Sequence, residues 1–346
     1  MPYFSFWYTI QQKLKFMQQS TLKELSQVLG ISISTVSRAL KDHPDISAKT
    51  KIKVKELALA LDYEPNTHAV QLRGGKSNVL GIMVPTIDNF FYDSFIAAVE
   101  EGARALGYSV LIMQSRDNVQ IETANINFLR KNMIMGLFAS VSIETDDFTP
   151  FEKLEELNTP VVFFDRVPET GIYNKVCLAD EDAAKIAANT IISKNKKTVL
   201  ALFGHPHLSI TRKRCAAFKE VFQKKSPDTK LTILYPEDIE ESNKVVLSLL
   251  SDKERPDVIF CMGDLILIGV MKAIHKLDLR VPEDIAVISI SNGMIPTMYN
   301  PRITYVETSA YALGKLAFNR MLSCLNNETV NKEVVLESRL VHGGSL

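Results

Sequence analysis

The pattern of apolar and polar positions changes near residue 77. Before that point, residues 21–61 show helical spacing in three short segments. The third segment carries a stripe of Val54, Leu57, Ala58 and Leu61 at the i, i+3, i+4, i+7 positions of one helix face, which is typical of a core-facing surface. Beyond residue 77, short apolar runs alternate with amphipathic segments. We therefore expect a small all-α domain followed by a larger α/β region.

The α/β region has strands and helices in alternation. Amphipathic segments separate most of the apolar runs, and alternation of this kind builds parallel sheets wrapped by helices. Because the pattern starts afresh after Asp180, two doubly wound parallel sheets in tandem fit better than one. The predicted strands are 79–85, 109–113, 135–141, 161–164, 198–203, 258–262 and 286–290, and the predicted helices are 93–106, 118–131, 181–194, 209–224 and 265–276.

The most informative motif lies in the helical region. Thr21-x-x-Glu24 is a capping box that opens a helix over 22–29, Gly30 ends it, and Ser32 can cap a second helix after a tight turn. This layout is typical of a helix-turn-helix, whose second helix enters the major groove of DNA. That second helix carries hydroxyls and a guanidinium suited to phosphates and base edges, at Ser32, Ser34, Thr35, Ser37 and Arg38.

The composition narrows the class of protein. The 346 residues are 46% hydrophobic with a mean hydropathy of +0.02, and no apolar run approaches the length needed to cross a bilayer. Four isolated cysteines, with no CxxC pair, favour free thiols in a reducing cytoplasm over disulfides or a zinc site. No GxSxG, HExxH or GxGxxG motif is present, so we expect a protein that is not an enzyme and holds no metal or cofactor.

The formal net charge of zero hides an asymmetry. Residues 20–76 carry nine Lys/Arg against six Asp/Glu, and the first 19 residues add two lysines and no acid. A basic head on an acidic body attracts phosphate at one end, although charge runs of this size are often only solvated surface.

Two segments fit neither region. The aromatic-rich residues 1–19 suggest an extension, and we expect Met17 to be the natural start. Pro65 and Gly74-Gly75 bracket about two helical turns, too short for a stable isolated helix. This segment is either a linker or a helix formed only on binding.

Residues 20–345 resemble the lactose-repressor (LacI/GalR) family of bacterial transcription regulators. The resemblance implies a dimer that reads a pseudo-palindromic operator, and a two-lobed domain similar to periplasmic sugar-binding proteins with an effector between the lobes. The motifs that carry it are Thr21-Leu22-Lys23-Glu24-Leu25, Val36-Ser37-Arg38-Ala39-Leu40, Ile46-Ser47-x-x-Thr50, Tyr63-x-Pro65-Asn66, Ala69-x-x-Leu72-Arg73, Leu80-Gly81-Ile82-Met83-Val84-Pro85, Arg214-Cys215-Ala216-Ala217-Phe218 and Leu279-Arg280-Val281-Pro282-Glu283-Asp284-Ile285-Ala286-Val287.

The resemblance divides the chain into an all-α helix-turn-helix headpiece and an α/β two-lobed domain. The expected divisions are the extension 1–19, the DNA-binding domain 20–66, a hinge helix 67–76, a first lobe from 77–178 and 307–337, and a second lobe from 179–306 and 338–346.

For DNA, the resemblance places Ile33, Ser34 and Arg38 toward the major groove. Ser32, Thr35 and Ser37 more naturally position the helix on phosphates. In the hinge, the resemblance implies that Leu72 enters the minor groove and helps to open a base step. The other hinge residues are Asn66 as the helix cap, Ala69 for close hinge packing, and Arg73 beside Leu72.

For the effector, the resemblance points to Arg214 and Asp264 in the second lobe and to Phe91 and Tyr92 in the first, although core packing explains the two aromatics equally well. Asp165 follows a strand and either faces the cleft or caps a loop. Thr308 stands where glutamine is common in the family, so the effector's identity does not carry over.

We expect a cytoplasmic repressor with a sugar or sugar derivative as effector. An activator with a nucleoside or purine effector, and a solute-binding protein with an incidental helical head, are the alternatives.

Overall fold

The computed structural model describes residues 21–63, 77–251, 255–329 and 331–346. The chain divides into two compact units, residues 1–76 and residues 77–346. The first unit ends in the hinge segment expected at 67–76, and the second begins at Ser77. The expected extension 1–19, its Met17, and the hinge residues Asn66, Ala69, Leu72 and Arg73 lie outside the described residues.

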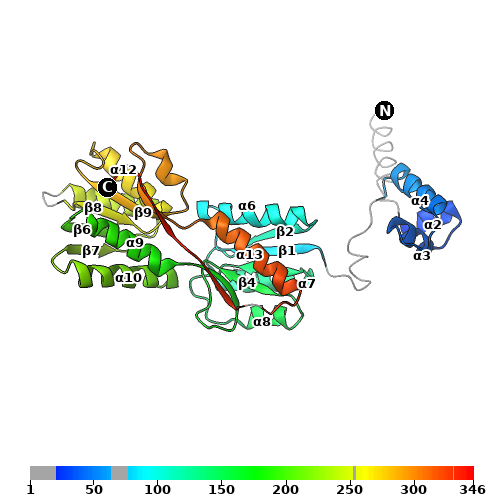
Figure 1. Ribbon diagram of the computed structural model, residues 1–346. Coiled ribbons are helices and arrows are strands. Elements are labelled where there is room, and N and C mark those ends of the chain that lie inside the picture. Colours follow the sequence, from blue (N-terminus) through cyan, green and yellow to red (C-terminus); the bar gives the residue numbers. More distant parts are fainter. Residues whose placement is uncertain (1–20, 64–76, 252–254, 330) are drawn as a thin grey trace, which may run out of the picture. The chain divides into compact units, whose positions relative to one another are not determined.

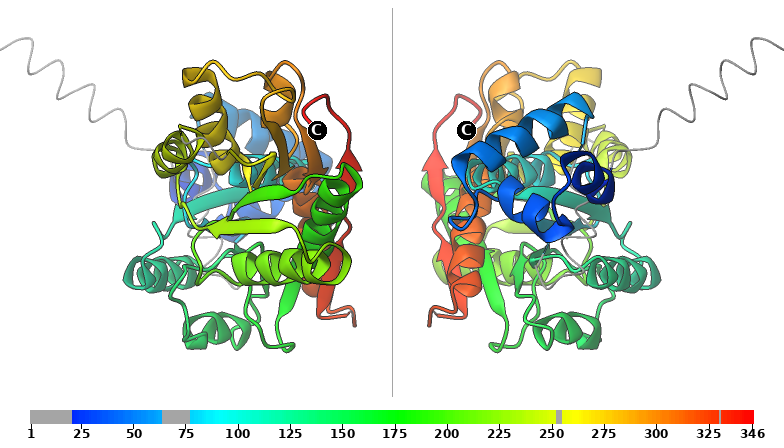
Figure 2. Two further views of the ribbon diagram at one scale, coloured as in Figure 1. Left: turned by 90° about the vertical axis from the view of Figure 1, so that its left-hand side faces the viewer. Right: turned by 90° about the vertical axis from the view of Figure 1, so that its right-hand side faces the viewer.

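The first unit contains three described helices, α2 (Leu22–Leu29), α3 (Ile33–Leu40) and α4 (Ala48–Ala60) (Figure 2). The capping box forms as predicted: the Glu24 amide donates to the Thr21 hydroxyl at 3.3 Å, and the Thr21 amide donates to the Glu24 carboxylate at 2.8 Å. Gly30 ends α2 at a φ of +63°, a left-handed conformation that glycine adopts without steric penalty. The chain therefore turns sharply into α3.

A small apolar core holds these helices together. Leu25, Val36, Ala39 and Val54 are fully buried, and Ala58 nearly so. The prediction that Leu61 belongs to this core is wrong, because α4 ends at Ala60 and the Leu61 side chain is 41% exposed.

The second unit contains two six-stranded sheets (Figure 1). The first has the order β11-β5-β4-β3-β1-β2 and is parallel throughout. The second has the order β12-β10-β9-β8-β6-β7, with only β12 antiparallel. The strands of the first are β1 (Val79–Val84), β2 (Ser109–Gln114), β3 (Gly136–Ala139), β4 (Val161–Phe164), β5 (Asn174–Leu178) and β11 (Glu333–Leu336); those of the second are β6 (Thr198–Leu202), β7 (Lys230–Leu234), β8 (Val258–Cys261), β9 (Ala286–Ser291), β10 (Thr304–Glu307) and β12 (Arg339–Val341).

Helices cover both faces of each sheet, so each sheet with its helices is one lobe. In the first lobe, α6 (Phe90–Ala105) and α13 (Ala310–Leu325) pack on one face, and α7 (Val119–Lys131) and α8 (Thr149–Glu155) on the other. In the second lobe, α9 (Asp180–Ser193) and α10 (Ser209–Lys225) face α11 (Ile239–Leu250) and α12 (Asp264–Lys276) across the sheet. The prediction of two doubly wound sheets is confirmed.

Five strands were missed by the sequence pattern: β5, β7, β10, β11 and β12. β7, β11 and β12 lie at sheet edges and contain no fully buried residue, so they lack a continuous buried run. In β5, the polar Lys175 is buried because its amine pairs with Glu333 at 3.0 Å. Helices α8, α11 and α13 were also not predicted.

The chain crosses between the lobes at three places: from β5 to α9, from β10 to α13, and from β11 to β12, the last being the red segment in Figure 1. Glu307 lies in β10 of the second sheet, one residue beyond the lobe boundary expected from the sequence. In both sheets the strand order places a topological switch point at the first strand, β1 or β6, where ligands bind in open α/β folds.

Candidate functional site

Helix α3 presents a polar surface on the rigid three-helix unit. The Ser32 hydroxyl accepts the Thr35 amide at 3.1 Å, so Ser32 is the N-cap and fixes the start of the helix. The same hydroxyl lies 2.7 Å from that of Ser34 and 2.8 Å from that of Thr35. Three hydroxyls therefore cluster at the positive end of the helix, where phosphate oxygens are favourably bound.

The residues expected to face the major groove are exposed. Ser34 and Arg38 are solvent-exposed one helical turn apart, and Ile33 is 39% exposed although it is apolar. Within the described part of the chain, the Arg38 guanidinium makes no hydrogen bond or ion pair. Its donors are available for a bidentate contact to guanine. Ser37 is only partly exposed and lies nearer the core.

A cavity of about 320 Å³ lies between the two lobes. Its lining comes from loops at the carboxyl ends of strands in both sheets, as expected for ligand sites of this architecture. The structure brings together all six residues that were predicted from the sequence: Phe91, Tyr92, Asp165, Arg214, Asp264 and Thr308.

In the first lobe, Tyr92 and Asp165 form one unit. The Tyr92 ring packs edge-on against Phe164 in the core, while its hydroxyl donates to Asp165 Oδ2 at 2.7 Å. The Ser140 hydroxyl donates to the same oxygen at 3.5 Å. Burial raises the pKa of the Asp165 carboxyl and, with Asp165 nearby, raises that of Tyr92. Tyr92 is thus both a core residue and a polar lining residue.

In the second lobe, Arg214 on α10 is buried and held in place. Its guanidinium donates to Asp180 Oδ1 at 2.8 Å from Nε and contacts the same oxygen at 2.6 Å from Nη2, and it donates to the Met262 carbonyl at 3.0 Å. These three contacts fix the plane of the guanidinium, so its remaining N–H groups point in defined directions.

Asp264 is the first residue of α12, and two residues at the carboxyl end of β9 hold its carboxylate in place. The Ser291 hydroxyl donates to its Oδ1, and the Asn292 amide donates to its Oδ2 at 3.1 Å. Burial raises the pKa of this carboxyl. Thr308 is buried, and its hydroxyl donates to the Ser291 carbonyl at 3.3 Å, so it supports this wall of the cavity.

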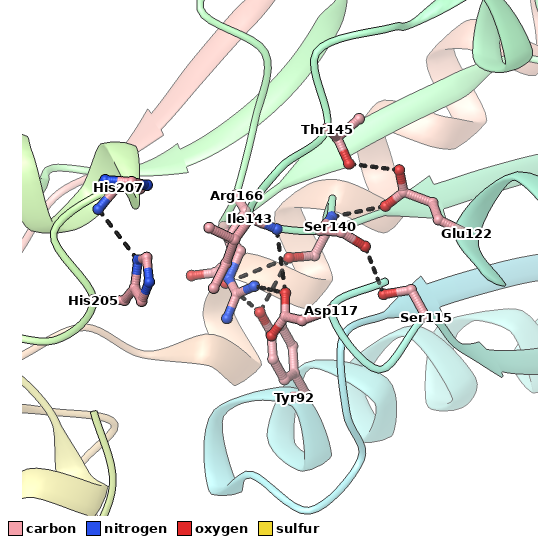
Figure 3. Close-up of polar contacts among 12 residues, drawn as sticks. Tyr92, Ser115, Asp117, Glu122, Ser140, Ile143, Thr145, Arg166, His205 and His207 are labelled. Atoms are coloured by element: carbon pink, nitrogen blue, oxygen red, sulfur yellow. Dashed lines mark hydrogen bonds and ion pairs between the residues drawn. The ribbon is translucent and has the colours of Figure 1, made fainter. Parts of the chain in front are cut away.

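Figure 3 shows lining residues that the sequence reasoning missed. Asp117, which follows β2, pairs with Arg166 and accepts the Ile143 amide at 3.3 Å. Behind this pair, buried Glu122 accepts the Ser142 amide at 2.7 Å and the Thr145 hydroxyl at 2.6 Å, which fixes the loop after β3. The sequence signal that could have identified Asp117 as a lining residue is its position shortly after the end of a strand.

Asn292 was also missed, and it links the lobes. Its side-chain Nδ2 donates to the Phe90 carbonyl at 3.2 Å and to the Ser94 hydroxyl at 2.7 Å, both on α6 of the first lobe. Its Oδ1 accepts the Ala310 amide at the start of α13 at 2.8 Å. Because its backbone amide also binds Asp264, Asn292 connects the cavity wall directly to the first lobe.

A second contact between the lobes is an ion pair. Arg212 of α10 pairs with Glu169 of the first lobe at 2.7 Å, and both side chains are exposed. An exposed pair contributes little to stability.

Comparison with known proteins identifies two domains. Residues 21–66 match the model for bacterial regulatory proteins of the lacI family, and residues 189–346 match the periplasmic binding protein-like domain. The chain therefore carries the DNA-binding domain of the LacI family together with a periplasmic binding protein-like domain. It is similar to a ribose operon repressor of Halalkalibacterium halodurans, 25% identical over 90% of this chain and 92% of that protein. It is also similar to catabolite control protein A of Priestia megaterium, 25% identical over 91% and 95%.

Solved structures of the family share the fold. The lac repressor dimer bound to operator and the anti-inducer ONPF superimposes with a TM-score of 0.85 at 22% identity, covering 95% of this chain and 99% of that one. The relatives that it matches over most of its length are named as transcription regulators and not as enzymes. No helix among the described residues is long and apolar enough to span a membrane. The described ranges also contain no group of three or more His, Cys, Asp and Glu placed to hold a metal.

Proposed function

We propose that this regulator is a repressor that binds operator DNA as a homodimer and responds to a small molecule in the interlobe cavity. The observation that carries the proposal is the combination of an exposed polar helix on a capped helix-turn-helix with a polar cavity at the strand ends of two lobes. Such a protein acts where the DNA is, in the bacterial cytoplasm.

For DNA, α3 enters the major groove with Ile33, Ser34 and Arg38 toward the bases. Ser32 and Thr35 contact phosphates, as their cluster at the helix N-terminus favours. Ser37, further along the same helix, also contacts phosphate. A bidentate contact from Arg38 to guanine is worth about 1–3 kcal/mol of discrimination between bases.

The homodimer follows from the way such proteins read DNA. Two-fold symmetric proteins match two-fold symmetric operators with half-sites about one helical turn apart. The similar lac repressor is a dimer on its operator. Sedimentation of the full chain tests the dimer.

The hinge residues complete the DNA contact. We propose that Asn66 caps a hinge helix over 67–76, that Ala69 allows two hinges to pack closely, and that Leu72, with Arg73 beside it, wedges into the minor groove. Unstacking a base step costs a few kcal/mol and bends the DNA. DNA curvature that is the same with wild type and Leu72→Ala would count against the wedge.

The effector is a sugar or sugar derivative held by Arg214, Asp264 and Asp165, with Phe91 and Tyr92 at its apolar side and Thr308 behind the second-lobe wall. The cavity volume lies at the lower end of the range for ligand pockets, about 300–1,000 Å³, which suits a monosaccharide. Activation in place of repression, with a nucleoside or purine effector, stays the alternative prediction.

A selection of random DNA fragments by the full chain tests the DNA-binding proposal. We expect enrichment of an inverted repeat. Arg38→Ala should then weaken binding to the selected site by about tenfold or more, while Lys53→Ala on the next helix changes it little. Equal affinity of Arg38→Ala and wild type would remove Arg38 from base recognition, and a selection that enriches no sequence would favour a solute-binding protein with an incidental helical head.

A further inference from the structure

The charges around the cavity do not balance. Its lining includes four carboxylates, from Asp117, Asp165, Glu237 and Asp264, against the guanidinium groups of Arg166 and Arg214 and the imidazole of His205, which lies 3.7 Å from Glu237. The lining therefore carries more negative than positive charge, and the pairing of each group decides what a ligand meets.

Both arginines are already neutralised by the protein. Arg166 pairs with Asp117, and Arg214 pairs with Asp180 at 2.6 Å while also donating to a backbone carbonyl. Phosphate and carboxylate ligands bind through charge-assisted hydrogen bonds to free cations. An anionic ligand here would meet only guanidinium groups whose charge an internal carboxylate already offsets.

Asp165 and Asp264 are different, because neither forms an ion pair with a lysine or arginine in the described ranges. Asp165 accepts hydrogen bonds only at Oδ2, from Tyr92 and Ser140, which leaves Oδ1 without a donor among those residues. Asp264 accepts one donor at each oxygen, and a carboxylate offers about four lone-pair positions. The two carboxylates therefore present unused acceptors from opposite lobes.

Burial raises the pKa of Asp165 by more than the nearby charges of Arg166 and Arg214 lower it. Buried carboxylates of this kind are stabilised by added hydrogen-bond donors. Hydroxyl and ammonium groups supply such donors, whereas phosphate and carboxylate groups add negative charge beside Asp165 and Asp264. Burial already raises the pKa of both carboxyls, as expected where few hydrogen-bond donors stabilise the ionised form.

We propose that the cavity takes an uncharged or amino-bearing polyhydroxyl compound and rejects its phosphorylated and carboxylated counterparts, with Asp165 and Asp264 as the residues that make this choice. This inference rests on the proposed function only for the cavity's role as effector site. The charge selection itself depends only on the residues that line the cavity.

The first test measures the charge of the wall without any effector. In the full chain, Ile143→Cys places a thiol in the cavity lining, and Leu106→Cys places one on an exposed control position in the same lobe. We compare reaction rates with a trimethylammonium-ethyl and a sulfonato-ethyl methanethiosulfonate, after subtracting the reaction of the parent chain. The cationic-to-anionic rate ratio should be about tenfold higher in the cavity than at the control, and adding Asp165→Asn should lower it.

A ratio no higher than that of the control overturns the inference. Leu208→Cys, also in the lining, provides a second position if Ile143→Cys does not fold.

The second test uses ligands. Calorimetry of the full chain with glucose, glucosamine, glucose 6-phosphate and glucosamine 6-phosphate varies the amine and the phosphate independently, and ribose with ribose 5-phosphate adds a pentose pair. The inference predicts that any binder is weakened about tenfold or more by its phosphate, and a phosphorylated member that binds as well as its parent overturns it. If none binds although the thiol ratio is high, the charge inference stands and the sugar effector of the proposed function fails.

Discussion

Asn292 offers the sharpest test of how the two lobes are joined. Its side chain makes three hydrogen bonds, to the Phe90 carbonyl, the Ser94 hydroxyl and the Ala310 amide, at 3.2, 2.7 and 2.8 Å. Each bond contributes about 1 kcal/mol net, so Asn292→Ala should lower the free energy of unfolding by about 3 kcal/mol. Ser94→Ala removes one of the three and also the bond from the Ser94 hydroxyl to the Phe90 carbonyl at 2.9 Å, so it should lower this free energy by about 2 kcal/mol.

Urea unfolding of the full chain, followed by far-ultraviolet circular dichroism, gives these free energies. Asn132→Ala is the matched control, because this exposed asparagine bonds only the Phe128 carbonyl of its own lobe, at 2.8 Å. We expect the control to change stability by less than about 0.5 kcal/mol. An Asn292→Ala variant no less stable than Ser94→Ala would refute the reasoning that this amide holds the lobes together.

Two further substitutions test other parts of the structure. Asp165→Asn should raise the midpoint of thermal unfolding at neutral pH, because burial raises the folded pKa of this carboxyl above its ordinary value of 3.8 and the ionised form is disfavoured; the gain should vanish as pH falls toward 3.8, and a gain that persists there would contradict this origin. The same variant should weaken effector binding in calorimetry, since one carboxylate of the wall is lost. Gly314→Ala should destabilise the first lobe by about 1–3 kcal/mol in urea titrations, because its Cβ would lie 2.7 Å from the Phe95 carbonyl oxygen; unchanged stability would show that α6 and α13 separate easily.

Structural features that depend on residues close together in the sequence were predicted. The capping box at Thr21 and Glu24, the turn at Gly30 and the N-cap at Ser32 depend on neighbours within a few residues, and the structure confirms all of them. The strands with continuous apolar runs were found for the same reason.

Features that depend on distant partners were missed. Lys175 reads as an exposed residue until β11 brings Glu333 to 3.0 Å, so β5 was not predicted. The role of Asn292 depends on α6, some 200 positions away in the chain, and no local pattern encodes it. In the cavity, the resemblance supplied lining residues, but the pairing of Arg214 with Asp180 required the structure.

The central claim is that one chain couples the cavity to DNA. Fluorescence anisotropy of the selected operator, titrated with the full chain with and without a saturating sugar that binds in calorimetry, tests it directly. We predict that the sugar changes operator affinity by about 5–150-fold, the range of a coupling free energy of about 1–3 kcal/mol, and that operator changes sugar affinity by the same factor. Superimposable titrations with and without the sugar would contradict the account.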